Sequence, residues 1–281
     1  MDSNTYVNLN ESRFISITGE DKSLFLQGLI TNDINKCKIA NPIYSCLLTP
    51  QGKFIADFFI SIFENEYLIE INKIFYESFF NKLNLYKLRS KISISENKKL
   101  KSLFLFNKNI SLENHESLII FDDPRNSFIG KKVYIDENYL KSFLDINNLI
   151  SKDYINYREI LIKNLIPYSP VDLSVNKSLL LENNFDNINA IDWEKGCYIG
   201  QEITARMKYR ALLKKQIYVL ELISGKIDKG DDIIIDNINI GKVISKVNKY
   251  ILCMLKIDLV KEKNENKKSF NIAPSTNLKF L

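Results

Sequence analysis

The chain has 281 residues, of which 45% are hydrophobic and 26% charged, and its formal net charge is +5. These values are typical of a soluble globular protein of about two domains. The surplus of basic residues could draw an anionic ligand into a cleft, but it is too small to indicate a nucleic-acid-binding domain. No stretch approaches the roughly 18 uninterrupted apolar residues that a membrane helix needs.

The first part of the chain alternates predicted strands and helices. Hydrophobic alternation predicts a strand at 13–18, and Thr18 with Asp21 three residues later predicts the cap of a helix that ends near Asn35. Further strands are predicted at 43–48, 54–63 and 67–71, followed by a helix at 73–88. The Pro-Gln-Gly sequence between the first two of these strands predicts a hairpin turn.

A second round of strands and helices follows, and the pattern then changes. Strands are predicted at 102–106 and 118–121, and helices at 137–149 and 151–163. This repeated order indicates an α+β fold built of ferredoxin-like α/β units. Four strand-like runs at 216–223, 231–235, 238–247 and 250–257 predict a small antiparallel β-barrel or sandwich after them. We therefore expect one region over 1–212, made of two interwoven α+β subdomains, and a C-terminal β-barrel over 213–281.

The four cysteines, Cys37, Cys46, Cys197 and Cys253, are scattered and form no CxxC pair. A disulfide framework is therefore not expected, and a reducing compartment is. The N-terminal residues are polar and lack the apolar stretch of a signal peptide. Together these features predict a cytoplasmic location. The absence of any cluster of His and Cys in the sequence argues against a metal site made by the chain alone.

The features of a reactive site gather in one segment, IDWEKGCYIGQEITARMKYR. Gly196 and Gly200 flank Cys197, which allows a tight turn and a close approach of a ligand to the backbone. A helix is predicted to follow Gly200, so Cys197 would lie just before a helix N-terminus and two residues from Lys195, and both features favour the thiolate. The same pattern also fits a small buried cysteine in a simple turn, so the residues alone leave both interpretations open.

Three segments of the chain resemble one protein family. The sequence KGCYIGQE at 195–202, followed by Arg206, is similar to the signature of the folate-binding YgfZ family. Members of that family are relatives of the glycine-cleavage T-protein and help to build or repair iron–sulfur proteins. FLQGLITND at 25–33 and LTPQGKF at 48–54 fit the same family in the same order, and the resemblance covers roughly residues 13–215. The family's Gly-hydrophobic-Pro stretch reads Leu165-Ile166-Pro167 here, which departs from the pattern.

The resemblance implies a ring of three domains around a central hole that holds tetrahydrofolate, with Cys197 as the functional thiol. The candidates for contact with the cofactor are Gln27, Asn32, Asp33, Phe54, Asp57, Lys195, Tyr198, Gln201, Glu202 and Arg206. Glu202 would hold the donor edge of the pterin, and Tyr198 or Phe54 would stack on its face. A Lys or Arg would meet the glutamate tail of the folate.

On this resemblance the chain is expected to be an accessory protein in the assembly or repair of iron–sulfur proteins, without classical enzymatic turnover. Its expected partners are folate and the assembly or client proteins, with which Cys197 could share a transient iron–sulfur cluster. Support of iron–sulfur enzymes that modify tRNA would then be indirect.

Three alternatives fit parts of the sequence. A folate-dependent aminomethyltransferase of T-protein type would use Asp57, but one carboxylate remains here where that enzyme has two. A cysteine hydrolase needs a positioned base, and the only histidine, His115, lies in a loop-like stretch without a motif. Direct RNA contact would use the basic cluster Lys208, Tyr209, Arg210, Lys214 and Lys215, which a solvated helix end also explains.

Overall fold

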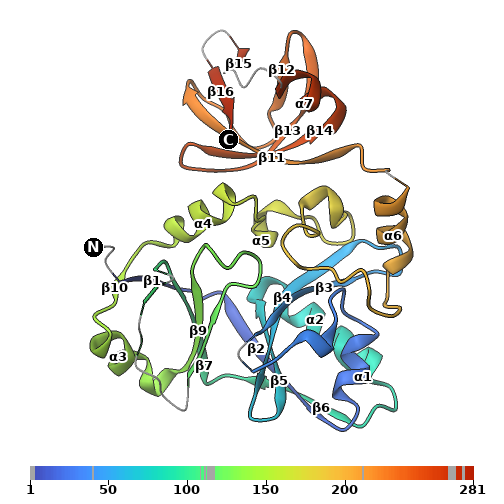
Figure 1. The fold of residues 1–281 in the computed structure, drawn as a ribbon, viewed down its shortest axis with the longest axis vertical. Helices are drawn as coiled ribbons and strands as arrows, with labels where there is room; N and C mark the ends of the chain where they lie inside the picture. The colour runs from blue at the N-terminus through green and yellow to red at the C-terminus, as the bar shows by residue number, and fades with distance from the viewer. Residues whose placement is uncertain are drawn as a thin grey trace.

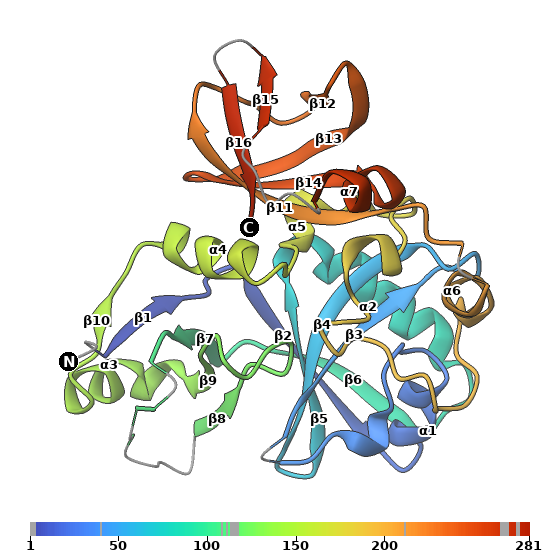
Figure 2. The same ribbon diagram turned by 45° about the horizontal axis from the view of Figure 1, so that its top comes forward.

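The computed structural model describes residues 4–39, 41–107, 109–110, 112, 118–210, 212–264, 270–273 and 276–281. This part of the chain is organised around three sheets. Figures 1 and 2 show two of the sheets side by side below the third, with helices α4 and α5 between the upper sheet and the lower pair.

The first lower sheet is antiparallel and has the strand order β3-β4-β5-β2-β6. Its strands are β2 (Ser12–Gly19), β3 (Ile43–Leu48), β4 (Phe54–Phe63), β5 (Glu66–Asn72) and β6 (Ile92–Asn97). Helix α2 (Lys73–Lys87) packs on this sheet through Phe75, Phe79 and Leu83, which the four-residue spacing places on one helix face. The short helix α1 (Lys22–Gln27) and the 3-10 turn η1 (Ile34–Lys36) connect β2 to β3.

The second lower sheet has the strand order β10-β1-β7-β9-β8. Its strands are β1 (Thr5–Asn8), β7 (Leu100–Leu105), β8 (Leu118–Asp122), β9 (Lys131–Asp136) and β10 (Ile150–Ser151), and helix α3 (Glu137–Ile146) packs against it. The chain begins in this sheet, builds the whole of the first sheet from β2 to β6, and then returns. The two sheets are therefore interleaved along the sequence.

The third sheet is a curled antiparallel half-barrel with the order β12-β13-β14-β11-β16-β15. Its strands are β11 (Lys215–Ser224), β12 (Asp232–Ile235), β13 (Ile238–Val247), β14 (Tyr250–Lys256), β15 (Phe270–Ala273) and β16 (Thr276–Phe280), and α7 (Ile257–Asn264) follows β14. The sheet encloses an apolar core that includes Leu220, Ile251 and Leu255. A second apolar cluster joins it to α4 through Ile162, which packs with Ile217 and Tyr250.

A long connecting segment links the second sheet to the third. Its regular elements are α4 (Tyr154–Lys163), α5 (Ser169–Asp172), the 3-10 turn η2 (Leu181–Asn183) and α6 (Gln201–Tyr209). Between η2 and α6 the chain runs beside α1 and η1, and Leu180, Phe185 and Tyr198 join the apolar core of the first sheet. The segment that carries KGCYIGQE is therefore anchored to the first sheet by apolar burial.

The expected α+β class with a C-terminal antiparallel structure is confirmed, and β3 and β4 begin and end at the predicted residues. The helix predicted to reach Asn35 instead ends at Gln27, because the Asp33 side chain accepts the backbone N–H of Asn35 and starts the separate turn η1. The predicted cap at Thr18 is also wrong. The N-cap is Asp21, whose carboxylate accepts the backbone N–H of Lys91.

Several elements were not predicted, among them β1, β6, β9 and α7, whose sequences are polar or short.

Leu165, which stands where the resembled family has glycine, adopts φ +53°. This left-handed conformation is strained for any residue that has a Cβ, and glycine avoids that cost in free energy. Among the described residues, no helix combines the length and the apolar character that crossing a membrane requires.

Candidate functional site

Cys197 lies in the cysteine loop, which we define as residues 191–200 between η2 and α6. Its side chain is exposed, whereas Cys37, Cys46 and Cys253 are buried. Burial raises the pKa of the Cys37 thiol to about 12 and moves the pKa of the other two buried thiols upward as well. Since the thiolate is the form that attacks or binds metal, the three buried thiols are disfavoured, and Cys197 is the thiol that a reagent or partner can reach.

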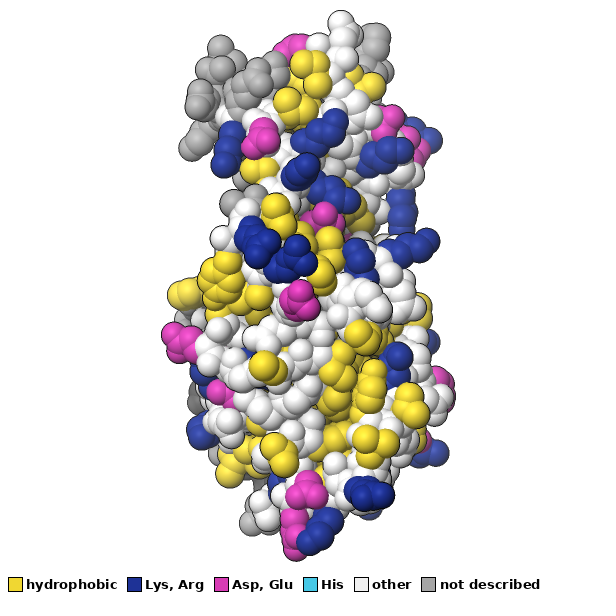
Figure 3. Space-filling model, turned by 90° about the vertical axis from the view of Figure 1, so that its right-hand side faces the viewer, with side chains coloured by type: hydrophobic (Ala, Val, Ile, Leu, Met, Phe, Trp, Pro, Cys, Tyr) yellow, Lys and Arg dark blue, Asp and Glu magenta, His cyan; other side chains and the backbone are white. Residues whose placement is uncertain are grey.

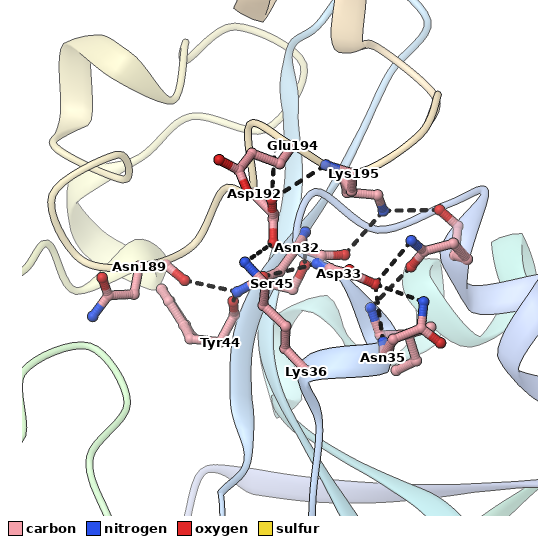
Figure 4. Close-up of polar contacts among 12 residues, drawn as sticks. Asn32, Asp33, Asn35, Lys36, Tyr44, Ser45, Asn189, Asp192, Glu194 and Lys195 are labelled. Carbon is pink, nitrogen blue, oxygen red and sulfur yellow. Dashed lines mark hydrogen bonds and ion pairs between the residues drawn. The ribbon is translucent and has the colours of Figure 1, made fainter.

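The Lys195 side chain points into the protein beneath the cysteine loop. Its ammonium is therefore not a free cation beside the Cys197 thiol. Its side chain is 8% exposed, and its ammonium donates hydrogen bonds to the backbone oxygens of Gln27, Ile30 and Asn32 at 2.8, 2.6 and 2.9 Å (Figure 4). Burial lowers the pKa of Lys195 to about 8, against the opposing effect of the Asp33 carboxylate. All three donors of Lys195 are used by these oxygens, and its contact with a cofactor stays a prediction.

Asp192 holds the same loop from its other end, and no pattern in the sequence singled it out. Its Oδ1 accepts the backbone N–H groups of Glu194 and Lys195 at 2.9 and 3.2 Å, and its Oδ2 pairs with Lys36 at 2.5 Å (Figure 4). Burial favours the neutral acid, but the bonds from Lys36 and from the two amides outweigh it and lower the Asp192 pKa. The carboxylate therefore stays charged and binds the loop to η1.

Backbone contacts complete the attachment of the loop. The N–H of Asp192 donates to Thr31 O at 3.0 Å, and the N–H of Ile199 donates to Gly28 O at 3.2 Å. Gly200, at φ +84°, lies so close to the β3–β4 turn that an added Cβ would be 2.5 Å from Thr49 O. The structure thus brings together all three segments that carry the family resemblance.

Gln27, Asn32 and Asp33 support this arrangement with their side chains. The Gln27 amide donates to Asp33 Oδ1 at 2.9 Å and accepts the N–H of Ile34. The Asn32 amide donates to Tyr44 O at 2.9 Å and to a backbone oxygen of the connecting segment at 2.8 Å. Since these groups already have protein partners, the geometry gives them a structural role, and contact with a cofactor remains a prediction.

The two aromatic residues expected to stack on a pterin are both buried. Phe54 is fully buried between Phe75 and Phe185, which leaves no open face for a ligand ring. Tyr198 is 7% exposed, and the Lys195 ammonium lies 5.0 Å from the centre of its ring. Its hydroxyl has no hydrogen-bond partner within the described residues, and burial raises its pKa. Both side chains pack in the core of this structure, and stacking of either one on a ligand stays a prediction.

The remaining motif residues lie on α6. Gln201 is half-buried, and the exposed Glu202 pairs with Arg206 one turn later at 3.8 Å, a spacing at which helical side chains meet. Figure 3 shows the face of the molecule that carries α6, with Lys and Arg side chains gathered in the upper middle of the view. Two lysines of the predicted basic cluster are paired with acids, Lys208 with Asp186 and Lys215 with Glu182. His115, expected in a loop-like stretch, lies outside the described residues.

Asp57 lies apart from the cysteine loop, in a cavity of about 70 Å³ between the two lower sheets and α4. Loss of water around the side chain raises its pKa, and its carboxylate accepts a hydrogen bond from the Tyr44 hydroxyl. The other polar residues around this cavity include Glu70, Arg125, Lys132, Tyr154 and Tyr168, none of which was predicted.

Two buried ion pairs form the wall of the cavity. Lys132 contacts Glu70 at 2.7 Å, and Arg125 makes a two-point contact with Asp123 at 3.0 and 2.7 Å. Desolvation raises the pKa of Glu70, but the Lys132 charge outweighs it, so the net shift is downward. The one signal in the sequence was a charged residue inside an apolar strand, as at Glu70.

A larger groove of about 680 Å³ opens on the other side of the Arg125–Asp123 pair, next to the cysteine loop. Tyr44 lines the groove and lies under the Arg125 guanidinium, 5.5 Å from ring centre to charge. The other lining residues include Asn32, Lys36, Asn41, Asn189, Asp192, Trp193 and Glu194. This volume is in the range of small-molecule sites, about 300–1,000 Å³.

No protein-family model matches the sequence. Among curated proteins, the chain is similar to mitochondrial homologues of the iron–sulfur cluster assembly factor IBA57. The Neurospora crassa protein is 30% identical over 228 residues, which cover 74% of this chain and 52% of that protein. The Dictyostelium discoideum protein is 27% identical over 251 residues, which cover 75% of this chain and 61% of that protein. The chain thus spans little more than half the length of the curated relatives it matches.

Among solved structures, the chain is similar to the glycine cleavage system aminomethyltransferase T from Bartonella henselae. The TM-score is 0.77, and the match covers 99% of this chain and 85% of that one at 11% sequence identity. At this identity the likeness establishes the fold, and the expected T-protein-like fold is confirmed. The chain belongs to the IBA57/YgfZ-type family, whose curated members are named iron–sulfur cluster assembly factors and whose fold is that of the glycine-cleavage T-protein.

Proposed function

We propose that the chain is an accessory protein in the assembly or repair of iron–sulfur proteins and that Cys197 supplies the working thiol. The observation that carries this proposal is the exposure of Cys197 on a loop fixed at both ends, while the other three thiols are buried. The names of the relatives support a role in iron–sulfur cluster assembly. The exposure of the thiol supports Cys197 as the residue that acts in it.

In this proposal the iron–sulfur cluster is cargo and not a resident cofactor. Clusters are held by several thiolates, and Cys197 offers one. Within the described residues no group of three or more His, Cys, Asp or Glu side chains is arranged to hold a metal ion. The proposal therefore needs a partner protein that provides the remaining ligands while Cys197 completes the set.

Folate is the cofactor that the T-protein fold suggests, and the two recesses differ in whether they could hold it. The cavity around Asp57, about 70 Å³ in this structure, is smaller than an engineered apolar cavity of about 150 Å³ that binds a single benzene. The groove, about 680 Å³, has room for a pterin and its aminobenzoyl group. The donor set around the groove also fits, because carboxylate and amide groups match the donor and acceptor edge of a pterin.

We therefore propose that tetrahydrofolate binds in the groove. The exposed Glu194 carboxylate would hold the pterin donors, and Lys36, at the opposite side of the loop, would meet the anionic tail. Bound folate would supply a one-carbon carrier, while the chain supplies orientation. Aminomethyl transfer beside Asp57 is disfavoured, because the cavity leaves too little room for folate next to that carboxylate.

The thiol is tested by the activity of iron–sulfur enzymes in cells that lack this protein and carry a plasmid-borne variant. Cys197→Ser is expected to fail to restore the activity, because serine is a poor ligand for iron–sulfur clusters. Cys253→Ser, at a buried position in β14, is the matched control and is expected to restore it. Full restoration by Cys197→Ser would overturn the role of the thiol.

Folate binding is tested by calorimetric titration of the purified chain with tetrahydrofolate. Glu194→Gln is expected to weaken binding by about tenfold or more, the effect of a lost charged hydrogen bond. Glu202→Ala, on the exposed face of α6, is the control and should bind like the unmodified chain. Loss of binding in Asp57→Asn with normal binding in Glu194→Gln would move the ligand from the groove to the cavity.

A further inference from the structure

We propose that Lys195 is a positioning residue that holds the cysteine loop on the backbone of residues 27–32 and thereby fixes the place of the Cys197 thiol. This inference rests on the proposed role of that thiol. It names the residue that orients the thiol, which the family resemblance did not do.

The first support is the complete use of the Lys195 ammonium. A lysine has three donors, and the three bonds to backbone oxygens, 2.6 to 2.9 Å long, use all of them. The acceptors are backbone atoms from residues 163 to 168 positions earlier in the chain. One side chain thus ties together two segments that are far apart in sequence.

The second support is the position of the acceptors. The oxygens belong to the last residue of α1 and to the turn that follows it, where carbonyl groups lack partners within a helix. A cation at that end also interacts favourably with the helix dipole. The Lys195 ammonium therefore satisfies groups that would otherwise be buried without a partner, and the loop gains an anchor there.

The third support is the short free stretch around the thiol. On one side the loop is held by Lys195, and on the other by the bond from Ile199 N–H to Gly28 O at 3.2 Å. Between these anchors Tyr198 is buried, and Gly196 and Cys197 are exposed. A Cβ added to Gly196 would meet nothing within 4 Å, so packing does not hold this part of the turn. Removing the Lys195 anchor should release the thiol on one side.

The test is the electron paramagnetic resonance line shape of a nitroxide label on Cys197, the exposed cysteine of the chain. In the unmodified protein the label should show a broad, immobilised component. Lys195→Met should lose that component, because the side-chain anchor beside the thiol is gone and only the backbone bonds around Asp192 and Ile199 remain. Lys195→Arg should retain part of it, since a guanidinium also donates several hydrogen bonds.

Two controls separate positioning from a general loss of stability. Lys208→Met removes a lysine on α6 that bonds Asp186, and Leu83→Ala opens a cavity in the core under α2. Both should keep the immobilised component, even where Leu83→Ala lowers stability as much as Lys195→Met. If Lys195→Met does not fold, Lys195→Gln takes its place with the same expected loss.

The positioning role would be overturned by an immobilised label in the folded Lys195→Met or Lys195→Gln protein. The same narrowing in Leu83→Ala at equal stability would also overturn it. Iron–sulfur enzyme activity in cells is a separate readout. A released label combined with full activity would support the positioning role of Lys195 and show that the activity does not need a fixed thiol. The role of the thiol itself fails only if Cys197→Ser restores activity, so the two proposals can fail independently.

Discussion

The cysteine loop and the cavity around Asp57 are built in different ways. In the loop, charged side chains bond to backbone atoms: the ammonium of Lys195 to three carbonyls, and the carboxylate of Asp192 to two amides. In the cavity wall, charged side chains bond to each other, as Lys132 does to Glu70. The loop presents a thiol to the outside, whereas the cavity encloses its charges.

This difference bears on the role of the KGCYIGQE sequence. Within the resembling segments Lys195, Gln27 and Asp33 use their side chains inside the protein, and Cys197 is the exposed thiol on the loop that Lys195 anchors. The fixed charges of the cavity come from residues outside any recognised motif. Substitutions in each region test this difference, and the largest expected effects on stability come first.

The largest effect is expected in the cavity wall. Lys132→Met leaves the Glu70 carboxylate buried without its counter-charge, which typically costs about 3–5 kcal/mol of unfolding free energy. Lys131→Met, on the same strand, removes an ion pair with the exposed Asp122 and should cost less than about 1 kcal/mol. Urea unfolding measures both, and equal costs would contradict the buried, charge-paired character of the wall.

The next effect is expected at the end of the cysteine loop. Gly200→Ala places a Cβ at φ +84° and 2.5 Å from Thr49 O, which should destabilise the protein by about 1–3 kcal/mol. Gly196→Ala, four residues earlier, meets open space and should be nearly neutral. Thermal unfolding of the two variants compares them directly. A neutral Gly200→Ala would mean that the loop is not pressed against the β3–β4 turn.

A smaller, pH-dependent effect is expected at Asp57. Its pKa is raised in the folded protein, so folding favours the protonated acid, and stability is lost as the pH rises from the unfolded pKa through the folded one. Asp57→Asn removes this loss and should stabilise the protein near neutral pH. The gain should shrink when unfolding is measured in acid. A destabilised Asp57→Asn at neutral pH would show that the charged form is the one the cavity prefers.

The smallest effect is expected on α6. Arg206→Ala removes an exposed ion pair in which nitrogen and oxygen lie 3.8 Å apart, and it should change stability by less than about 0.5 kcal/mol. Tetrahydrofolate affinity should also be unchanged, because neither Arg206 nor Glu202 lines the groove. A large loss of tetrahydrofolate affinity in Arg206→Ala would show that α6 takes part in the binding site.

The sequence was a good guide where the signal is local. Strands β3 and β4 were predicted to the residue because their β-rich runs are interrupted by a clear turn. The Glu202–Arg206 pair follows from helical spacing alone. The KGCYIGQE string likewise located the loop and its exposed cysteine.

The roles within the site could not be read from local patterns. The partners of Lys195 are backbone oxygens of a distant segment, and their positions depend on where α1 ends. The cavity wall joins Glu70 of β5, Arg125 of a loop and Lys132 of β9, which only the packing of two sheets brings together. An aromatic residue beside a turn can stack on a ligand or pack in the core, and the sequence does not distinguish the two. In the structure Phe54 is buried in the core.

Titration of the native protein with an aromatic disulfide reagent tests most directly whether the chain offers one working thiol. One fast-reacting thiol per chain, absent in Cys197→Ser, is the expected result, with all four thiols reacting after denaturation. An unreactive native protein would contradict the exposure of Cys197. A fast-reacting thiol that persists in Cys197→Ser would contradict the assignment of the function to this residue.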